Sequence, residues 1–195
     1  MKKEINTASL LKEILQAQKT SGELPPVEKW NPPLCENIEM QISKDGKWSF
    51  MNSPIGREKM VRLFSSVLRL DPDGFYYLVT PVEKIKINVV DKPFVIVTYD
   101  KEKIDNKETF FFQTNVGDVV PLNSSHPLRV DFSKTTNEPS PYLLVRKNLE
   151  GLISRNVFYN FSDQSDSLLS YAREVKKRIK ENFDIALEFE PTIFS

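Results

Sequence analysis

The fold of this 195-residue chain is decided by residues 75–132, which read FYYLVTPVEKIKINVVDKPFVIVTYDKEKIDNKETFFFQTNVGDVVPLNSSHPLRVDF. Short segments rich in β-branched and aromatic residues recur along this stretch, and turn-forming or charged residues separate them. We expect six strands, at residues 75–80, 84–90, 94–99, 109–114, 118–122 and 128–132. Strands that are short and regularly spaced predict a curled antiparallel sheet or a partly open barrel.

Upstream of these strands, the sequence predicts a hairpin followed by a helix. Apolar and polar residues alternate over 38–42 and 48–50, on either side of an Asp45-Gly46 turn. Ser53-Pro54 is a typical helix start, and an apolar stripe runs from Arg57 to Leu70. Residues 7–20 predict an earlier amphipathic helix, and the proline-rich residues 23–33 predict an extended arm.

Downstream, the sequence predicts a strand at residues 142–145 and a helix on which Leu149, Ile153 and Val157 face the core. A second helix over 166–182 and a strand over 185–189 follow. The second helix is rich in lysine and arginine near its C-terminal end, where cations are favourable in any case. We therefore expect a solvated basic face there rather than a patch for nucleic acid or membrane.

An internal repeat is visible as strand, turn, strand, arginine and helix, at residues 38–70 and more loosely at 128–159. Aligning Arg57 with Arg146 brings apolar helix positions into register, although chance amphipathicity could also produce this match. We divide the chain into an N-terminal helix and arm (1–33), a hairpin-helix unit (34–80) and a C-terminal unit (81–195). The predicted class is α+β with a duplicated core.

The overall composition excludes several classes of protein. Twenty-seven basic residues balance twenty-seven acidic ones, so no global field would recruit nucleic acid or anionic lipid. The single cysteine, Cys35, cannot form an internal disulfide, as is typical of a reducing compartment. No apolar run approaches the roughly 20 residues that span a bilayer. We expect a cytoplasmic protein with no membrane partner.

Motifs for metal, nucleotide-hydrolysis and nucleophile chemistry are missing from the sequence. One histidine and one cysteine leave a metal site dependent on carboxylates, and we expect His126 to be a loop residue and Cys35 a small buried thiol. None of the six glycines builds a phosphate-binding loop, and no serine lies in a nucleophile elbow. We expect no cofactor and no metal.

The arginines are the most informative charged residues. Arg57 falls in the predicted first helical turn, where a cation opposes the helix dipole and requires a compensating anion. Arg62 lies on the same helix, and Arg146 occupies the matching place in the second repeat. Guanidinium groups that converge between two units would bind a phosphate or carboxylate bidentately. The structural alternative is an ion-pair network whose carboxylates are Glu83, Asp91 or Asp45.

The order of motifs resembles the bacterial family called domain of unknown function 1285. The resemblance covers about residues 30–160. It rests on Trp30-Asn31-Pro32, Asp45-Gly46-Lys47-Trp48, Pro54-Ile55-Gly56-Arg57, Val61-Arg62-Leu63-Phe64, Leu78-Val79-Thr80-Pro81-Val82-Glu83, Asp91-Lys92-Pro93-Phe94, Thr114-Asn115-Val116-Gly117-Asp118, His126-Pro127-Leu128, Tyr142-Leu143-Leu144-Val145-Arg146 and Arg155-Asn156-Val157-Phe158-Tyr159. The charged helix at 166–182 departs from the family pattern, so any family contact made by that end is in doubt.

The resemblance implies a duplicated core whose C-terminal half is similar to a pleckstrin-homology barrel closed by a helix. It also implies a nucleotide-like ligand at the interface of the halves and a role in signalling. A pleckstrin-like outline does not by itself imply phosphoinositide binding, because fold does not determine function.

Together these observations lead to three hypotheses. The first is a non-enzymatic protein that binds a small anionic or nucleotide-like ligand between its units. Its site would be lined by Trp48, Arg57, Arg62, Glu83 and Arg146, with Trp48 stacking on a ring. The second is a protein-interaction module whose motifs build core and interface. The third is an enzyme in which Asp45, Glu83 or Asp91 is the acid or base.

Overall fold

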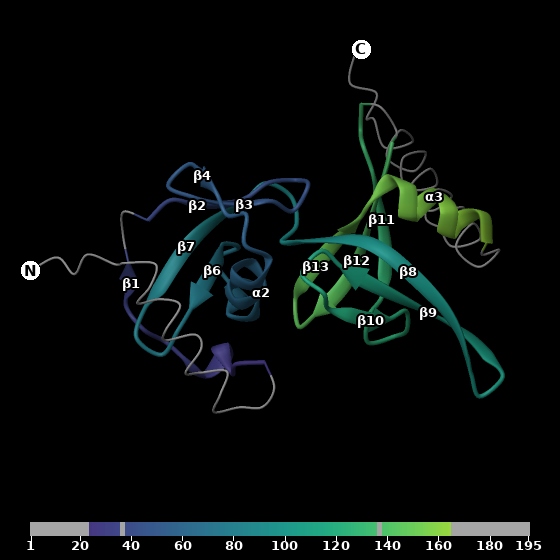
Figure 1. Ribbon diagram of the computed structural model, residues 1–195, viewed down its shortest axis with the longest axis horizontal. Helices are drawn as coiled ribbons and strands as arrows, with labels where there is room; N and C mark the ends of the chain where they lie inside the picture. Colours follow the sequence, from purple (N-terminus) through teal and green to yellow (C-terminus); the bar gives the residue numbers. More distant parts are fainter. Residues whose placement is uncertain (1–23, 36–37, 136–137, 165–195) are drawn as a thin grey trace, which may run out of the picture.

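The computed structural model describes residues 24–35, 38–135 and 138–164, which form two sheets joined by a short connection (Figure 1). We call residues 24–89 the first unit and residues 94–164 the second unit. The expected helices at 7–20 and 166–182 and the strand at 185–189 lie outside the described residues.

The first unit contains a sheet with the strand order β4-β3-β2-β7-β6-β5, and β1 also pairs with β7. Its elements in chain order are the 3-10 helix η1 (Val27–Lys29), β1 (Leu34–Cys35), β2 (Met40–Ile42), β3 (Trp48–Phe50), β4 (Ser53–Pro54), α2 (Glu58–Ser66), β5 (Leu68–Leu70), β6 (Tyr76–Val79) and β7 (Lys84–Val89).

The second unit contains a curled sheet with the strand order β10-β9-β8-β13-β12-β11. Its elements are β8 (Phe94–Ile104), β9 (Lys107–Thr114), β10 (Val119–Pro121), β11 (Leu128–Phe132), β12 (Pro139–Arg146), β13 (Leu149–Ile153) and α3 (Arg155–Gln164). Helix α3 packs on β8, and Phe161 makes edge-on contacts with Phe110 and Phe112 at centroid distances of 4.7 and 5.1 Å.

The expected duplication is confirmed by the topology. Both sheets consist of two three-stranded antiparallel meanders joined at the centre by a parallel pair, β2 with β7 in one unit and β8 with β13 in the other. The units differ in the place of their helix, since α2 connects the two meanders of the first unit and α3 follows both meanders of the second. The expected antiparallel pairs thus flank a central parallel pair in each sheet, and the first sheet has a second parallel pair, β1 with β7.

The repeat alignment that matched Arg57 with Arg146 is wrong. Arg57 is the N-cap of α2, whereas Arg146 ends strand β12. The apolar residues from Leu149 to Ile153 form strand β13, and the expected helix begins only at Arg155. Alternating burial along β13 places Leu149 and Ile153 on the core side, a spacing that a helical stripe shares.

The predicted boundaries of the first helix also need correction. Ser53-Pro54 forms the short strand β4, and α2 ends at Ser66 rather than at Leu70. Residues Leu68–Leu70 instead form the edge strand β5, which pairs with β6. In this position the β6 backbone satisfies the backbone hydrogen-bonding groups of β5. Strand β7 belongs to the first sheet, so the units divide between Val89 and Phe94 and not after residue 80.

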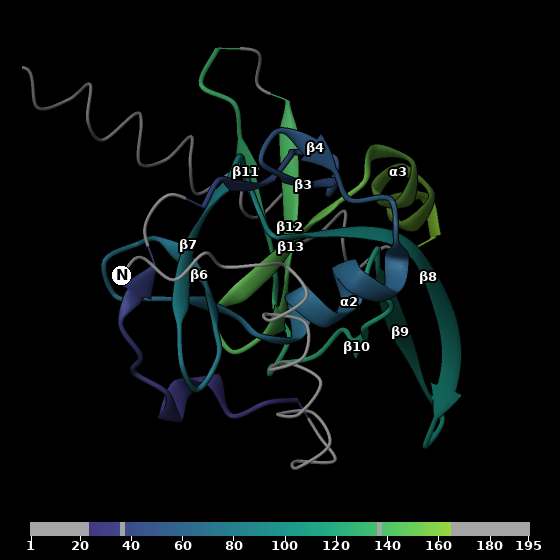
Figure 2. The ribbon, with the colours of Figure 1, turned by 60° about the vertical axis from the view of Figure 1, so that its left-hand side comes forward.

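The two units share one hydrophobic core. A continuous cluster of buried apolar side chains extends from Val27 of the arm to Phe161 of α3. Helix α2 lies between the first sheet and the second unit (Figures 1 and 2), with Leu63 and Phe64 buried. The β8–β9 hairpin extends away from this core, and Asp105 and Asn106 form its left-handed turn.

Candidate functional site

The units meet first where the β2–β3 turn of one contacts the end of strand β9 in the other. The Asn115 side-chain amide donates to the Gly46 carbonyl oxygen at 3.1 Å, and its oxygen accepts from the Val95 backbone N–H at 3.0 Å. Gly46 has φ of +78°, and a Cβ added there would lie 2.6 Å from Asn115 Nδ2. Only glycine fits this close approach.

Arg146 is the central charged group of the junction. Its Nη1 pairs with Asp118 Oδ2 at 2.9 Å, and its Nη2 donates to the carbonyl oxygen of Ser65 near the C-terminal end of α2. The guanidinium also covers the Phe94 ring at 4.9 Å. Burial lowers the pKa of the Arg146 guanidinium, and the Asp118 carboxylate acts in the opposite direction. Arg146 thus links both units and neutralises a helix terminus.

Arg62 lies next to the turn at Gly117 and Asp118, the residue that Arg146 pairs with. Its guanidinium carbon would be 3.3 Å from a Cβ added at Gly117, so the missing side chain of Gly117 makes room for it. Arg62 is exposed, and no ion pair or side-chain hydrogen bond engages it within the described ranges. Arg62 and Arg146 therefore lie against adjacent residues, Gly117 and Asp118.

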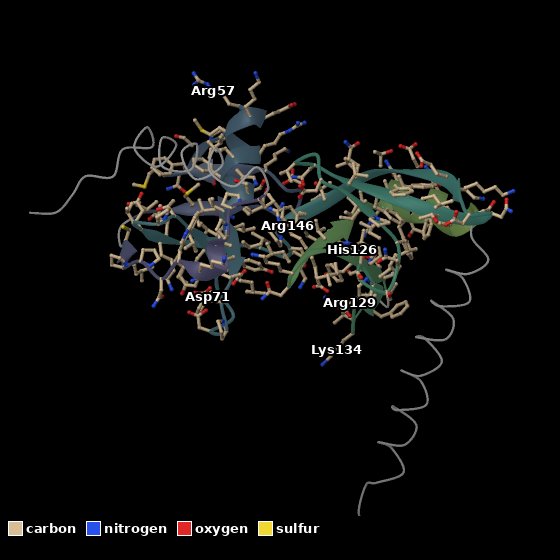
Figure 3. The ribbon with its side chains drawn as sticks, turned by 90° about the horizontal axis from the view of Figure 1, so that it is seen from below. Arg57, Asp71, His126, Arg129, Lys134 and Arg146 are labelled. Carbon is tan, nitrogen blue, oxygen red and sulfur yellow. The ribbon has the colours of Figure 1, made fainter. Side chains whose placement is uncertain are left out.

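Arg57 does not join them. It is exposed at the start of α2, and Figure 3 shows it pointing away from Arg146, which lies between the units. No ion-pair partner for Arg57 is found in the part of the chain that the structure describes. The expectation that a first-turn arginine must be answered by an anion is wrong here, because water solvates the exposed guanidinium.

Trp48 and Glu83 occupy other parts of the molecule. The Trp48 side chain is 2% exposed and stacks on Phe64 of α2 at a centroid distance of 6.2 Å, so it cannot hold a ligand ring from solvent. Glu83 is buried in the turn between β6 and β7, where the Cys35 thiol donates to its Oε2 at 3.5 Å. The structure places Glu83 beside the β1–β7 pair.

The three carboxylates of the enzyme hypothesis have different partners. Asp45 is exposed and pairs with Lys47 at 2.6 Å, which lowers the pKa of Asp45 to about 2. Asp91 accepts from the Tyr142 hydroxyl at 3.1 Å, and Glu83 lies beside Cys35. Across residues 24–35, 38–135 and 138–164, no group of three or more metal-ligating side chains is found.

A groove of about 590 Å³ opens where the arm, the first sheet and the second unit meet. We call it the junction groove. Its lining residues come from the arm, from the β5–β6 connection and from the β12–β13 turn, and they are Glu28, Trp30, Asn31, Arg69, Leu70, Asp71, Pro72, Gly74 and Asn148. Asn148 crosses between the units, since its amide donates to the Leu70 carbonyl oxygen at 3.0 Å.

Ion pairs hold the walls of the junction groove, and Asp71 takes part in two of them, with Arg69 and with Lys84. Arg69 forms a fork with Asp71 and donates to the carbonyl oxygens of Val27 and Trp30 at 2.7 and 2.8 Å, which fixes the arm. On the other wall Lys147 pairs with Glu28 at 2.9 Å. Asp71 lies on the opposite side of the first unit from Arg57 (Figure 3). The groove is therefore preformed, with charges that are largely balanced.

The buried ion pair of Arg69 and Asp71 predicts that the stability of the protein falls at acid pH. The hydrogen bond from Arg69 lowers the pKa of Asp71 below the usual 3.8. A depressed folded-state pKa stabilises the protein above the unfolded value and loses that contribution as the pH falls through the folded value. We expect Asp71→Asn to lower the free energy of unfolding at pH 7 and to differ less from wild type at pH 3, as urea unfolding at both pH values would measure. An unchanged difference would contradict this assignment.

Sequence reasoning missed most of the junction groove. Trp30 and Asn31 were present in the family motifs, but no local pattern assigned them to a site. Arg69 falls within residues 57–70, which the sequence assigned to a helix, although it is nine-tenths buried in strand β5. The available signal was the spacing of Arg69 and Asp71, which would lie on the same face of a strand, because an arginine that becomes buried needs a partner.

The fold and the junction define the class of protein: a duplicated two-sheet α+β chain whose halves meet over a preformed groove. Residues 25–92 match the model for the N-terminal domain of the domain of unknown function DUF1285, and residues 93–174 match the model for the C-terminal domain of the same family. The chain belongs to the DUF1285 family. The boundary between the two models coincides with the connection between the sheets.

Two solved structures are similar to this chain. A DUF1285 family protein from Silicibacter pomeroyi DSS-3 is 41% identical with a TM-score of 0.67, over 77% of this chain and 82% of that one. A DUF1285 family protein from Shewanella baltica OS155 is 26% identical with a TM-score of 0.51, over 65% of this chain and 92% of that one. No curated protein matched. None of the helices in the described ranges is long and apolar enough to span a membrane.

Proposed function

We propose that this protein is a non-enzymatic, cytoplasmic binder of a small nucleotide-like ligand, with a ligand-responsive role in signalling. The observation that carries the proposal is the junction groove, which is lined from both units and the arm. Its volume of about 590 Å³ lies within the range of small-molecule sites. A ligand that contacts all three parts would respond to, and stabilise, their relative arrangement.

The lining favours the planar part of such a ligand. Trp30 offers a half-buried indole for stacking, and the amides of Asn31 and Asn148 offer donors and acceptors of the kind that pair with base edges. Glu28 and Asp71 would oppose a phosphate inside the groove. We therefore place the base in the groove and the anionic group at its rim, near Lys147.

Thermal shift and calorimetry with adenosine, guanosine and their monophosphates test the proposal. A ligand at 100 times its dissociation constant adds about 2.7 kcal/mol of stability. We expect Trp30→Ala to lose the response, because stacking is worth about 1–3 kcal/mol per base. Arg57→Ala, on the far side of the unit, should keep the response. Binding that survives Trp30→Ala would place the site elsewhere.

The interaction-module hypothesis also has a specific observation behind it. The motifs around Gly46, Arg62, Asn115 and Arg146 all take part in packing one unit on the other, and this packing is complete without a ligand. If none of the nucleosides or nucleotides binds, these motifs are explained by the junction alone, and the interaction module becomes the better reading.

A further inference from the structure

A second groove, of about 710 Å³, lies on the outer face of the first sheet. It is lined only by residues of the first unit, and only Gly74 is shared with the junction groove. Its floor is formed by β2, β3, β6 and β7, and its lining residues are Ile38, Glu39, Met40, Gln41, Ser49, Asn52, Gly74, Phe75, Tyr76, Lys86, Ile87, Asn88 and Val89.

Four of these residues form one row across the sheet. Gln41 is directly opposite Ser49 of β3 on one side and Asn88 of β7 on the other. Since Tyr76 is opposite Ile87, Phe75 continues the row one position beyond Asn88. Directly opposed residues point to the same face of a sheet, about 4.8 Å apart. We call Ser49, Gln41, Asn88 and Phe75 the amide row.

The polar groups of the amide row are available to a ligand. Gln41 and Asn88 are exposed, and Ser49 is half-buried. Within the described part of the chain, none of these three side chains forms a hydrogen bond. Each amide supplies two N–H donors and a carbonyl acceptor, and the serine hydroxyl can do both. The row therefore matches a ligand that carries many groups able to donate and accept at once.

The charges beside the row are already engaged. Glu39 accepts from the Asn52 amide at 3.2 Å, and the Lys86 ammonium lies 3.1 Å from the centroid of the Phe75 ring. One carboxylate and one ammonium also cancel in net charge. A strongly anionic or cationic ligand would thus find no unpaired opposite charge in this groove. A neutral ligand can bind without one.

We propose that this groove binds a neutral oligosaccharide. Two neighbouring hydroxyls of a sugar ring can accept a hydrogen bond from a side-chain amide N–H and donate one to its carbonyl oxygen. The strand spacing of about 4.8 Å is close to the length of one sugar residue in an extended chain, so successive residues meet Ser49, Gln41 and Asn88 in turn. Phe75, whose side chain is 48% exposed, provides an apolar end against the C–H face of a ring.

The test uses the full-length protein with cellotriose, an extended trisaccharide, and maltotriose, a curved one. Saturation-transfer NMR and calorimetry should show cellotriose binding more tightly, because an extended chain keeps its sugar residues near the regular spacing of the strands. The Gln41→Ala, Asn88→Ala double variant should weaken binding by at least about tenfold, since each lost polar contact is worth about 1 kcal/mol. Gln113→Ala, which removes an exposed strand amide from the second sheet, is the matched control.

Three outcomes would overturn the proposal. The first is that neither trisaccharide binds with a Kd tighter than about 10 mM. The second is binding that the double variant leaves unchanged while its melting temperature equals that of wild type. The third is occupancy of this groove by a nucleotide or a peptide, shown by chemical-shift changes at Gln41 and Asn88 that the trisaccharides do not produce. Loss of the Trp30-dependent nucleotide response would leave this inference untouched, since the two grooves use different side chains.

Discussion

Replacing Gly46 with alanine is expected to destabilise the protein by about 3 kcal/mol, because two penalties coincide at this turn. The left-handed backbone of Gly46, with φ of +78°, costs an alanine about 1–2 kcal/mol. The new Cβ would also lie 2.6 Å from Asn115 Nδ2 and 2.9 Å from Val95 Cγ2. Relieving that overlap would disturb the hydrogen bond that joins the units and add about 1–3 kcal/mol.

Two other glycines separate these penalties. Gly74 has φ of +81° but no atom within 4 Å of an added Cβ, so Gly74→Ala should cost only the backbone term. Gly56 has neither constraint, and Gly56→Ala should stay within about 0.5 kcal/mol of wild type. Urea unfolding of the three variants measures the series. Equal losses at Gly46 and Gly74 would show that the β2–β3 turn does not pack on the second unit in solution.

Replacing Arg146 with methionine is expected to cost about 3 kcal/mol, within the range for breaking one partner of a buried ion pair. The variant keeps most of the apolar contact with Phe94 but leaves the Asp118 carboxylate and the Ser65 carbonyl without their donor. At this chain length, such a loss lowers the melting temperature by about 6–12 °C. Differential scanning calorimetry would measure it.

Arg146→Lys and Arg57→Ala complete the comparison. Lysine retains the charge but cannot reach Asp118 and Ser65 with two arms of a planar fork, so an intermediate loss is expected. Arg57 is exposed and its removal should change stability by less than about 0.5 kcal/mol. If Arg146→Met were as mild as Arg57→Ala, the guanidinium would not be holding the units together.

The strands of this protein could be predicted from its sequence. Alternation and β-branched content are local properties, and the segments around Tyr76–Val79, Lys84–Val89 and Leu128–Phe132 formed where they were expected. The tight turn at Asp105 and Asn106 adopts positive φ at both residues. The strands on either side of it are longer than expected, because they include charged residues that the sequence predicts to form a loop. The duplication was also detectable, although its alignment was wrong because helical and strand spacing coincide over five residues.

The candidate site could be predicted only in part. Arg62 was selected because it shares a helix with Arg57, and Arg146 because the repeat alignment matched it with Arg57, and both lie against the Gly117–Asp118 turn. Trp48 was misplaced, because the sequence shows that it lies on an apolar strand face but not that Phe64 covers it. Arg57 was misplaced because the start of α2 is exposed.

By itself, the sequence determined the number of strands in its central segment and the family to which they belong. Tertiary structure alone decided that β2 pairs with β7 and β8 with β13, since parallel pairing joins segments far apart in the chain and depends on the whole core. It also decided which side chains meet. Hydrogen bonds such as that from Asn115 to Gly46 span 69 residues, and no local periodicity encodes a contact that only the packing of two sheets creates.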